Sequence, residues 1–186
     1  MRAWLDQRNI HLTKSLGQNF LHDQHQLQRI VAAGEITTAD KGLEIGPGLG
    51  PLTELLLAQA GEVLAIEMGA RVVEVLKERF GSEFRLQAVG SESTKPPKGG
   101  TPNFQLVHDD ALEYIRREPR DWSEWKLVAN LPYSVASPIL VELALAPQRP
   151  KQMPVTLQLE VAKRLMAQAD DDDYGVLTLL VQLDYE

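Results

Sequence analysis

The stretch Glu44-Ile45-Gly46-Pro47-Gly48-Leu49-Gly50 decides the fold of this chain of 186 residues. It continues a short apolar run, and an amphipathic segment begins just after it, at Leu52. Glycine lets the backbone turn sharply, and it lets a ligand approach the main chain where a Cβ atom would collide. The stretch therefore predicts a tight turn from a buried strand into a helix, at the edge of a sheet where ligands bind.

The rest of the chain alternates short apolar runs with amphipathic segments, which is typical of βαβ units around a parallel sheet. The pattern at Gly175–Glu186 allows a strand or a helix, and we favour the helix. We therefore expect a Rossmann-like α/β domain with a five-stranded parallel sheet flanked by helices. The expected strands are Gly42–Ile45, Val63–Ile66, Gln105–His108, Lys126–Ala129 and Val155–Leu159. The other expected helices are Asp23–Ala33, Leu52–Ala60, Ala70–Phe80, Ser137–Ala146 and Glu160–Gln168.

The glycine spacing distinguishes two organic cofactors. A dinucleotide site needs G-x-G-x-x-G, whereas Gly46, Gly48 and Gly50 fall at every second position. Pro47 also removes one N–H donor that a pyrophosphate would use. The loop therefore favours S-adenosylmethionine, and the alternative, on the loop alone, is a turn without a ligand. We expect no metal, because the chain has no cysteine and its four histidines lack a ligand-like spacing.

Two carboxylates are expected to hold this cofactor. Glu67 ends the second strand, where a carboxylate can accept hydrogen bonds from both ribose hydroxyls. Met68 beside it offers a polarizable apolar surface to an adenine face, although methionine is also a common core residue. Asp110 ends the third strand and can accept from the adenine amino group, with Ala111 leaving room for the base. The alternative for the acids at 109 and 110 is a turn or a helix cap.

The tetrapeptide Asn130-Leu131-Pro132-Tyr133 follows the fourth strand and indicates the reaction. An exocyclic adenine amine is a poor nucleophile because its lone pair is delocalised into the ring. If the Asn130 side-chain oxygen and a neighbouring main-chain carbonyl accept its two N–H groups, the nitrogen is drawn towards tetrahedral geometry. Pro132 stiffens the turn, and Tyr133 supplies a stacking face for an extruded base. We therefore predict methylation of an adenine amine.

With these motifs in place, the chain resembles the KsgA-type ribosomal RNA adenine N6,N6-dimethyltransferases over nearly its whole length. The resemblance rests on Lys14–Leu21 (KSLGQNFL), the loop in the form EIGPGLG, the NLPY tetrapeptide and Tyr174-Gly175. It implies a class I methyltransferase fold. It also implies dimethylation of two adjacent adenosines in the 3′-terminal hairpin loop of small-subunit rRNA during ribosome biogenesis. Unpaired loop bases suit such an enzyme because they cost less to extrude than paired ones.

The resemblance also implies roles for individual residues. Asn19 and Leu21 would contact the methionine part of the cofactor, Gly46 would pack beneath it, and Asn130 would bridge cofactor and target amine. The cofactor-binding residues expected are Gln18, Asn19, Leu21, Glu44, Gly46, Gly48, Gly50, Glu67, Met68, Asp110, Ala111 and Asn130. The catalytic residues expected are Asn130, Leu131, Pro132 and Tyr133.

We expect residues 1–186 to form one catalytic domain, with residues 1–38 as an N-terminal arm and helix that close the cofactor site. Residues 90–103 (GSESTKPPKGGTPN) predict a mobile surface insertion, because they are too polar for a core. The family continues with two further strands and a helical domain that helps to dock rRNA, so we expect this chain to be truncated before them. Gly69 and Leu159 depart from the aspartate and lysine common at these positions.

The net charge of the chain indicates what kind of partner it can bind. The formal net charge of -7 argues against nucleic acid, since phosphate binding needs local positive charge. Basic side chains nonetheless gather at the N-terminus, while Asp170–Asp173 lie elsewhere, so an assembling small ribosomal subunit remains the expected partner. No apolar run approaches the roughly 20 residues that span a bilayer, and the N-terminus is not a signal sequence. We expect a cytoplasmic monomer.

Two other functions stay open. One is a large-subunit rRNA adenine N6-methyltransferase of the antibiotic-resistance type, which shares the fold. The other is a non-catalytic ribosome-assembly or transcription factor of the same fold. The N-terminal motif and the amino-acid sequence of the glycine loop favour the small-subunit enzyme. The presence of Asn130 and Tyr133 favours catalysis. A nicotinamide-dependent oxidoreductase is the least favoured interpretation.

Overall fold

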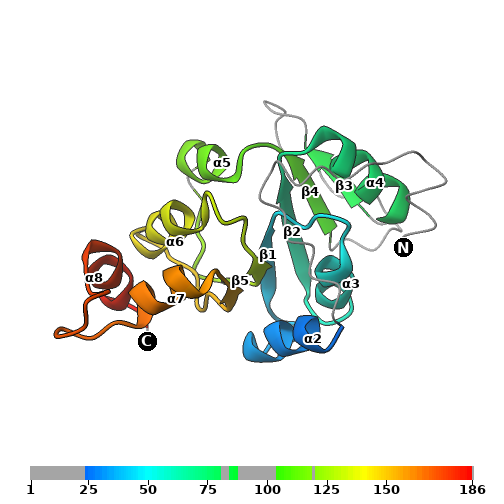
Figure 1. The fold of residues 1–186 in the computed structure, drawn as a ribbon. Helices are drawn as coiled ribbons and strands as arrows, with labels where there is room; N and C mark the ends of the chain where they lie inside the picture. The colour runs from blue at the N-terminus through cyan, green and yellow to red at the C-terminus, as the bar shows by residue number, and fades with distance from the viewer. Residues whose placement is uncertain (1–23, 81–83, 88–103, 119, 186) are drawn as a thin grey trace.

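The computed structural model describes residues 24–80, 84–87, 104–118 and 120–185 (Figure 1). The strands are β1 (Lys41–Ile45), β2 (Glu62–Glu67), β3 (Phe84–Gln87), β4 (Phe104–His108), β5 (Trp125–Leu127), β6 (Ala129–Asn130) and β7 (Val155–Thr156). The helices are α2 (Gln24–Ala33), α3 (Pro51–Leu57), α4 (Ala70–Phe80), α5 (Ala111–Arg117), α6 (Ala136–Ala144), α7 (Leu159–Met166) and α8 (Val176–Gln182).

The main sheet has five parallel strands in the order β3-β4-β2-β1-β5. Its register pairs Ile45 with Ile66 and Glu67 with His108. The carboxyl ends of β1, β2 and β4 therefore lie side by side, and the segments that leave them meet at one edge. In open α/β sheets this edge is where ligands bind. The predicted Rossmann-like α/β fold is confirmed.

The strand that leads to the NLPY tetrapeptide is interrupted at Val128, which separates β5 from β6. β6 pairs in parallel with β7, with Asn130 opposite Thr156. The same neighbouring segment also runs beside β5, because the Leu127 N–H donates to the Gln152 carbonyl at 2.9 Å. The segment around β7 thus continues the sheet layer beyond β5 and lies next to Asn130.

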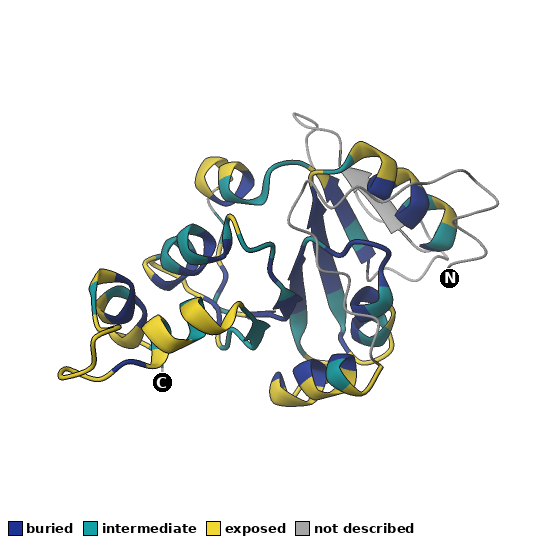
Figure 2. Cartoon of the chain, viewed as in Figure 1, coloured by how far each residue is buried: buried dark blue, intermediate teal, exposed yellow. Residues whose placement is uncertain are grey.

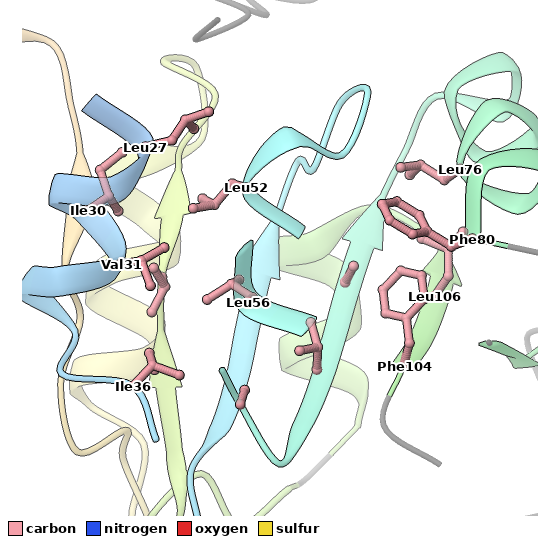
Figure 3. Packing of buried hydrophobic residues seen from close by; sticks show 14 of the residues in the cluster. Leu27, Ile30, Val31, Ile36, Leu52, Leu56, Leu76, Phe80, Phe104 and Leu106 are labelled. Carbon is pink, nitrogen blue, oxygen red and sulfur yellow. The ribbon is translucent and has the colours of Figure 1, made fainter. Parts of the chain in front are cut away.

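Helices cover both faces of the sheet, and its central strands are accordingly buried (Figure 2). Val63 and Ala65 of β2 pack in a cluster with α2, α3 and α4, part of which is shown in Figure 3. Leu64 and Ile66 pack on the opposite face, in a cluster with α5 and α6. α8 packs on α6, and α7 is the helix that stays most exposed. The buried core thus fixes β2, whose last residue is Glu67.

Several predicted boundaries are wrong. The predicted strand Val155–Leu159 is only two residues long, because the chain turns into α7 at Leu159, and it pairs with β6 outside the main sheet. The main sheet still has five strands because β3, which the sequence pattern does not predict, takes the edge beside β4. Helix α5 is also not predicted. The predicted insertion at 90–103 and the arm before Gln24 lie outside the described residues.

The remaining predictions hold within a few residues. The bounds of α4 agree with the predicted Ala70–Phe80, and the ambiguous C-terminal segment forms a helix, α8. The helix predicted at Leu52–Ala60 ends earlier, at Leu57, and those predicted at Ser137–Ala146 and Glu160–Gln168 end two residues early.

None of the helices in the described ranges combines the length and hydropathy needed to cross a membrane.

A buried lysine fastens the loop after α2 to the sheet. The Lys126 Nζ donates to the Gly34 and Glu35 carbonyls, each at 3.0 Å, and lies 3.3 Å from an Asp40 carboxylate oxygen. We expect Lys126→Met to lower the free energy of unfolding by about 2–4 kcal/mol, because it leaves buried acceptors without their donor. Urea denaturation measures this, with Lys151→Met, which breaks an exposed ion pair, as the control. Equal small losses in both variants would contradict the expectation.

Candidate active site

The glycine loop between β1 and α3 depends on left-handed backbone conformations. Gly46, Gly48 and Gly50 have φ angles of 67°, 57° and 79°, which residues with a Cβ atom rarely adopt. Space is limiting as well, because a Cβ atom on Gly50 would lie 2.6 Å from Phe80 Cε2. The Gly50 N–H donates to the Pro47 carbonyl at 2.9 Å and closes the turn from which α3 starts. The predicted strand–loop–helix turn is confirmed.

The glycine loop touches the NLPY loop. A Cβ atom on Gly46 would lie 3.1 Å from Cγ and 3.3 Å from Cδ of Pro132, so the proline ring packs directly on this glycine. The two loops come from β1 and β6, which are far apart in sequence but adjacent in space. The NLPY loop, which we expect to hold the target amine, thus borders the glycine loop, which we expect to hold the cofactor.

Glu67 ends β2 with a buried carboxylate that reaches back to the glycine loop. Its Oε1 accepts from the Gly69 N–H at 2.8 Å, and its Oε2 accepts from the Gly48 N–H at 3.3 Å. Burial raises the pKa of Glu67, while the hydrogen bonds from these N–H groups and the charge of His108 act in the opposite direction. A carboxylate has about four lone-pair sites, so one carboxylate can accept hydrogen bonds from main-chain N–H groups and from a ligand at the same time.

A second buried acid lies beneath the loop. Glu44 of β1 is 1% exposed, and its Oε2 accepts a hydrogen bond from the Thr53 hydroxyl at 2.6 Å. Burial raises the pKa of Glu44 to about 8; the Thr53 hydrogen bond lowers it and the nearby charge of Glu67 raises it further. Glu44 is not among the residues that line the cavity described below; the structure buries it next to the loop, and its predicted contact with the cofactor stays a prediction.

The raised pKa of Glu44 makes stability depend on pH. In the unfolded chain this carboxyl loses its proton above its ordinary pKa of 4.5, whereas the folded protein keeps the proton until about pH 8. Its contribution to stability is therefore complete below pH 4.5 and is lost as the pH rises towards 8, by about 1.4 kcal/mol per pH unit. We expect Glu44→Gln to reduce this slope of unfolding free energy between pH 5 and 8.

Urea titrations at several pH values measure the slope, and Glu74→Gln, at an exposed position on α4, serves as the control. Burial also raises the pKa of Glu67, so its effect on the pH dependence of stability has the same sign. Some decrease of the unfolding free energy with pH should therefore persist in the Glu44→Gln variant. Identical slopes for the wild type and Glu44→Gln would contradict the expectation.

The two acids after β4 have different partners. The Asp110 Oδ1 accepts from the Glu113 N–H at 3.0 Å and caps α5, so the helix-cap alternative is correct for this residue. Asp109 forms an ion pair with Arg117 and also accepts from the Asp110 N–H at 2.9 Å. Asp110 nevertheless lines the same cavity as Gly46. Capping uses one of its oxygens and leaves the other for a ligand.

One cavity collects the ends of these segments. Six of the residues predicted for the site line it: Gly46, Glu67, Met68, Asp110, Ala111 and Pro132. The residues that the sequence did not single out are Ile45, Ile66, Asp109, Leu112, Ser134 and Val135. The apolar members come from β1, β2, α5 and the start of α6, so the cavity has apolar walls with three acids, Glu67 at the end of β2 and Asp109 and Asp110 before α5. Within the described residues, no group of acids or histidines could hold a metal ion.

The other members of the NLPY tetrapeptide lie close to this cavity but do not line it. Asn130 and Tyr133 are half-buried, while the Leu131 side chain is 1% exposed and packs in the core. Its N–H donates to the Thr156 carbonyl at 3.3 Å. The Asn130 Oδ1 accepts a hydrogen bond from the Thr156 hydroxyl at 2.5 Å, a partner that no sequence pattern indicated.

Three predicted cofactor residues, Gln18, Asn19 and Leu21, lie outside the described residues and stay predictions. Two contacts around the loop were also not foreseen. The Arg79 guanidinium of α4 donates to the Leu49 carbonyl, and the His108 ring lies 3.2 Å from the Met68 carbonyl. Both contacts hold a loop of the site from a neighbouring element, which is information that only the tertiary structure contains.

The sheet order and the cavity at the carboxyl ends of β1, β2 and β4 define a class I methyltransferase fold. A dimethyladenosine transferase from Plasmodium falciparum matches with a TM-score of 0.66 and 28% identity, over 86% of this chain and 50% of that chain. The 23S rRNA methyltransferase ErmE matches with a TM-score of 0.59 and 27% identity, over 78% of this chain and 50% of that chain.

The chain belongs to the ribosomal RNA adenine dimethylase family, whose model matches residues 9–186. Relatives include the ribosomal RNA small subunit methyltransferase A of Dehalococcoides mccartyi (strain CBDB1), which is 39% identical over 91% of this chain and 52% of the relative. The enzyme of the same name from Clostridium perfringens (strain SM101 / Type A) is 38% identical over 94% of this chain and 55% of the relative. The chain thus spans about half the length of these relatives.

Proposed function

We propose that this chain is the S-adenosylmethionine-binding catalytic domain of an enzyme that dimethylates two adjacent adenosines at N6, in the 3′-terminal hairpin loop of small-subunit rRNA. The observation that supports this most is the packing of Pro132 on Gly46 at the rim of the cavity that Glu67 and Asp110 border. It joins the loop expected to hold the target amine to the loop expected to hold the cofactor. Family membership supports the substrate.

The residues around the cavity fit S-adenosylmethionine. Glu67 would accept from the ribose hydroxyls, and Asp110 would accept from the adenine amino group. Met68 and Ile66 offer apolar surface to the adenine between these two acids. When bound, this cofactor supplies a methyl group carried on a positively charged sulfur. Gly46, with no Cβ atom, would let the cofactor pass close to the main chain.

The NLPY loop would prepare the acceptor. Asn130 would accept one N–H of the target adenine amine, and a neighbouring main-chain carbonyl would accept the other, which orients the nitrogen lone pair. Tyr133 would stack on the extruded base, as aromatic side chains do with unpaired RNA bases. Both residues are half-buried beside the cavity, a position in which partial exclusion of water strengthens hydrogen bonds.

Exposed basic side chains on α7 would attract the RNA. α7 begins three residues after Thr156, and it carries exposed Lys163 and Arg164 in its last turn. Local basic groups of this kind can bind phosphates even though the formal net charge of the chain is -7. The acidic run at Asp170–Asp173 follows α7 and would face away from the RNA under this proposal.

The test is to supply the protein with S-adenosylmethionine carrying a labelled methyl group, together with unmethylated small ribosomal subunits or large-subunit rRNA. We expect N6,N6-dimethyladenosine at two adjacent positions of the small-subunit rRNA, identified by mass spectrometry of its nucleosides. Label in large-subunit rRNA alone would favour the alternative that the similarity to ErmE supports. Binding to the subunit without any label would favour the non-catalytic alternative.

A further inference from the structure

A threonine on the strand next to the NLPY loop holds the side chain of Asn130. β6 and β7 pair in parallel with Asn130 opposite Thr156, so both side chains emerge at the same level of the sheet layer. The Thr156 hydroxyl donates to the Asn130 Oδ1 at 2.5 Å. This contact involves the same oxygen that the proposed function requires as an acceptor.

An asparagine amide needs such a partner if it is to act as an acceptor. Rotation about its last torsion has broad, roughly two-fold preferences, and the two orientations exchange the oxygen for an NH₂ group of nearly the same shape. In this structure the Thr156 hydroxyl is the donor to Oδ1, and this bond holds the amide in the orientation shown. An amide oxygen has two lone pairs, so it can accept from an amine of the substrate as well as from Thr156.

The hydroxyl is not required to pair the strands. The Leu131 N–H donates to the Thr156 carbonyl, and the Ala129 N–H donates to the Pro154 carbonyl, so main-chain bonds join the two segments on both sides of Asn130. Valine has nearly the same shape as threonine and suits a strand equally well. The part of Thr156 that the fold does not need is therefore its hydroxyl group.

We infer that Thr156 is a positioning residue, whose hydroxyl fixes the amide of Asn130 with its oxygen available to the target adenine amine. The inference rests on the proposed function. Thr156 would touch neither cofactor nor substrate, and it would act only through Asn130. Losing the contact would leave binding of S-adenosylmethionine intact and would slow the step in which the amine must be held in one geometry.

The kinetic test compares the wild type with Thr156→Val and Thr156→Ser under single-turnover conditions. We expect Thr156→Val to slow methyl transfer roughly tenfold, the size expected for one hydrogen bond, with the dissociation constant for the cofactor changed less than about twofold. Thr156→Ser keeps the hydroxyl and should restore most of the rate. A rate equal to the wild type in Thr156→Val, or an equally slow Thr156→Ser, would overturn the inference.

A second measurement does not depend on activity. The Asn130 side-chain NH₂ group gives a pair of NMR signals, and we expect these to shift and broaden in Thr156→Val but to stay as in the wild type in Thr156→Ser. Unchanged signals in Thr156→Val would overturn the inference even if the enzyme is active. A wild type that methylates no rRNA would instead contradict the proposed function, and with it the role of Thr156 in the reaction. Thermal unfolding of both variants identifies any general loss of stability.

Discussion

Asn130→Ala is expected to lower the rate of methyl transfer to rRNA by about 10³-fold, while the dissociation constant for S-adenosylmethionine changes by less than about threefold. Removing one preorganised hydrogen-bond group from a reacting centre commonly costs about 10²–10³-fold. Here the loss is at the upper end because Asn130 would both accept from the amine and aim it. Its side chain lies outside the cavity lining, so cofactor binding should be largely spared.

Single-turnover transfer of a labelled methyl group and calorimetric titration of the cofactor separate these two effects. The control is Gln148→Ala, which truncates an exposed amide on the loop after α6 that does not line the cavity. It should transfer methyl groups at the wild-type rate. Near-normal transfer by Asn130→Ala would remove this residue from the reaction and leave Pro132 with a purely structural role in the loop.

Glu67→Gln is expected to raise the dissociation constant for S-adenosylmethionine about 100-fold. Each hydrogen bond to a charged group is worth about 1.5–3 kcal/mol, and an amide is neutral and offers one acceptor oxygen where a carboxylate offers two. The substitution also weakens the contacts with Gly48 and Gly69, which loosens the glycine loop in the same direction. The two effects act together because Glu67 connects the loop to the ligand.

The matched control for this variant lies on the same strand. Glu62 starts β2 at the opposite end, where it forms a 3.7 Å ion pair with Lys41, and Glu62→Gln should bind the cofactor as the wild type does. Isothermal titration calorimetry gives both dissociation constants, and circular dichroism verifies the fold. Wild-type affinity in Glu67→Gln would show that the ribose is held elsewhere.

The sequence predicted which residues meet at one cavity, because this depends on topology. Parallel strands place their carboxyl ends at one edge, so Gly46, Glu67 and Asp110 could be assigned to a common cavity from their positions after apolar runs. The bounds of α4 were predictable since its apolar residues recur at helical spacing over eleven residues. β3 is only four residues long and gives a weak signal.

The contacts between side chains could not be predicted in the same way. The bond between Thr156 and Asn130 depends on the register of β6 against β7, and a shift by one residue would turn one of the side chains away. The missed helix α5 did leave a signal, because Asp110 followed three residues later by Glu113 is the spacing of an N-terminal cap. The pairing of Glu44 with Thr53 likewise required knowledge of how α3 packs.

A crystal structure of the protein with S-adenosylhomocysteine tests the central claim most directly, since this ligand keeps every part of the cofactor except the methyl group. The account predicts ribose hydroxyls on the Glu67 carboxylate, the adenine amino group at Asp110, and the sulfur on the side of Pro132 and Asn130. A ligand bound outside this cavity would contradict the account, as would one whose sulfur points away from the NLPY loop.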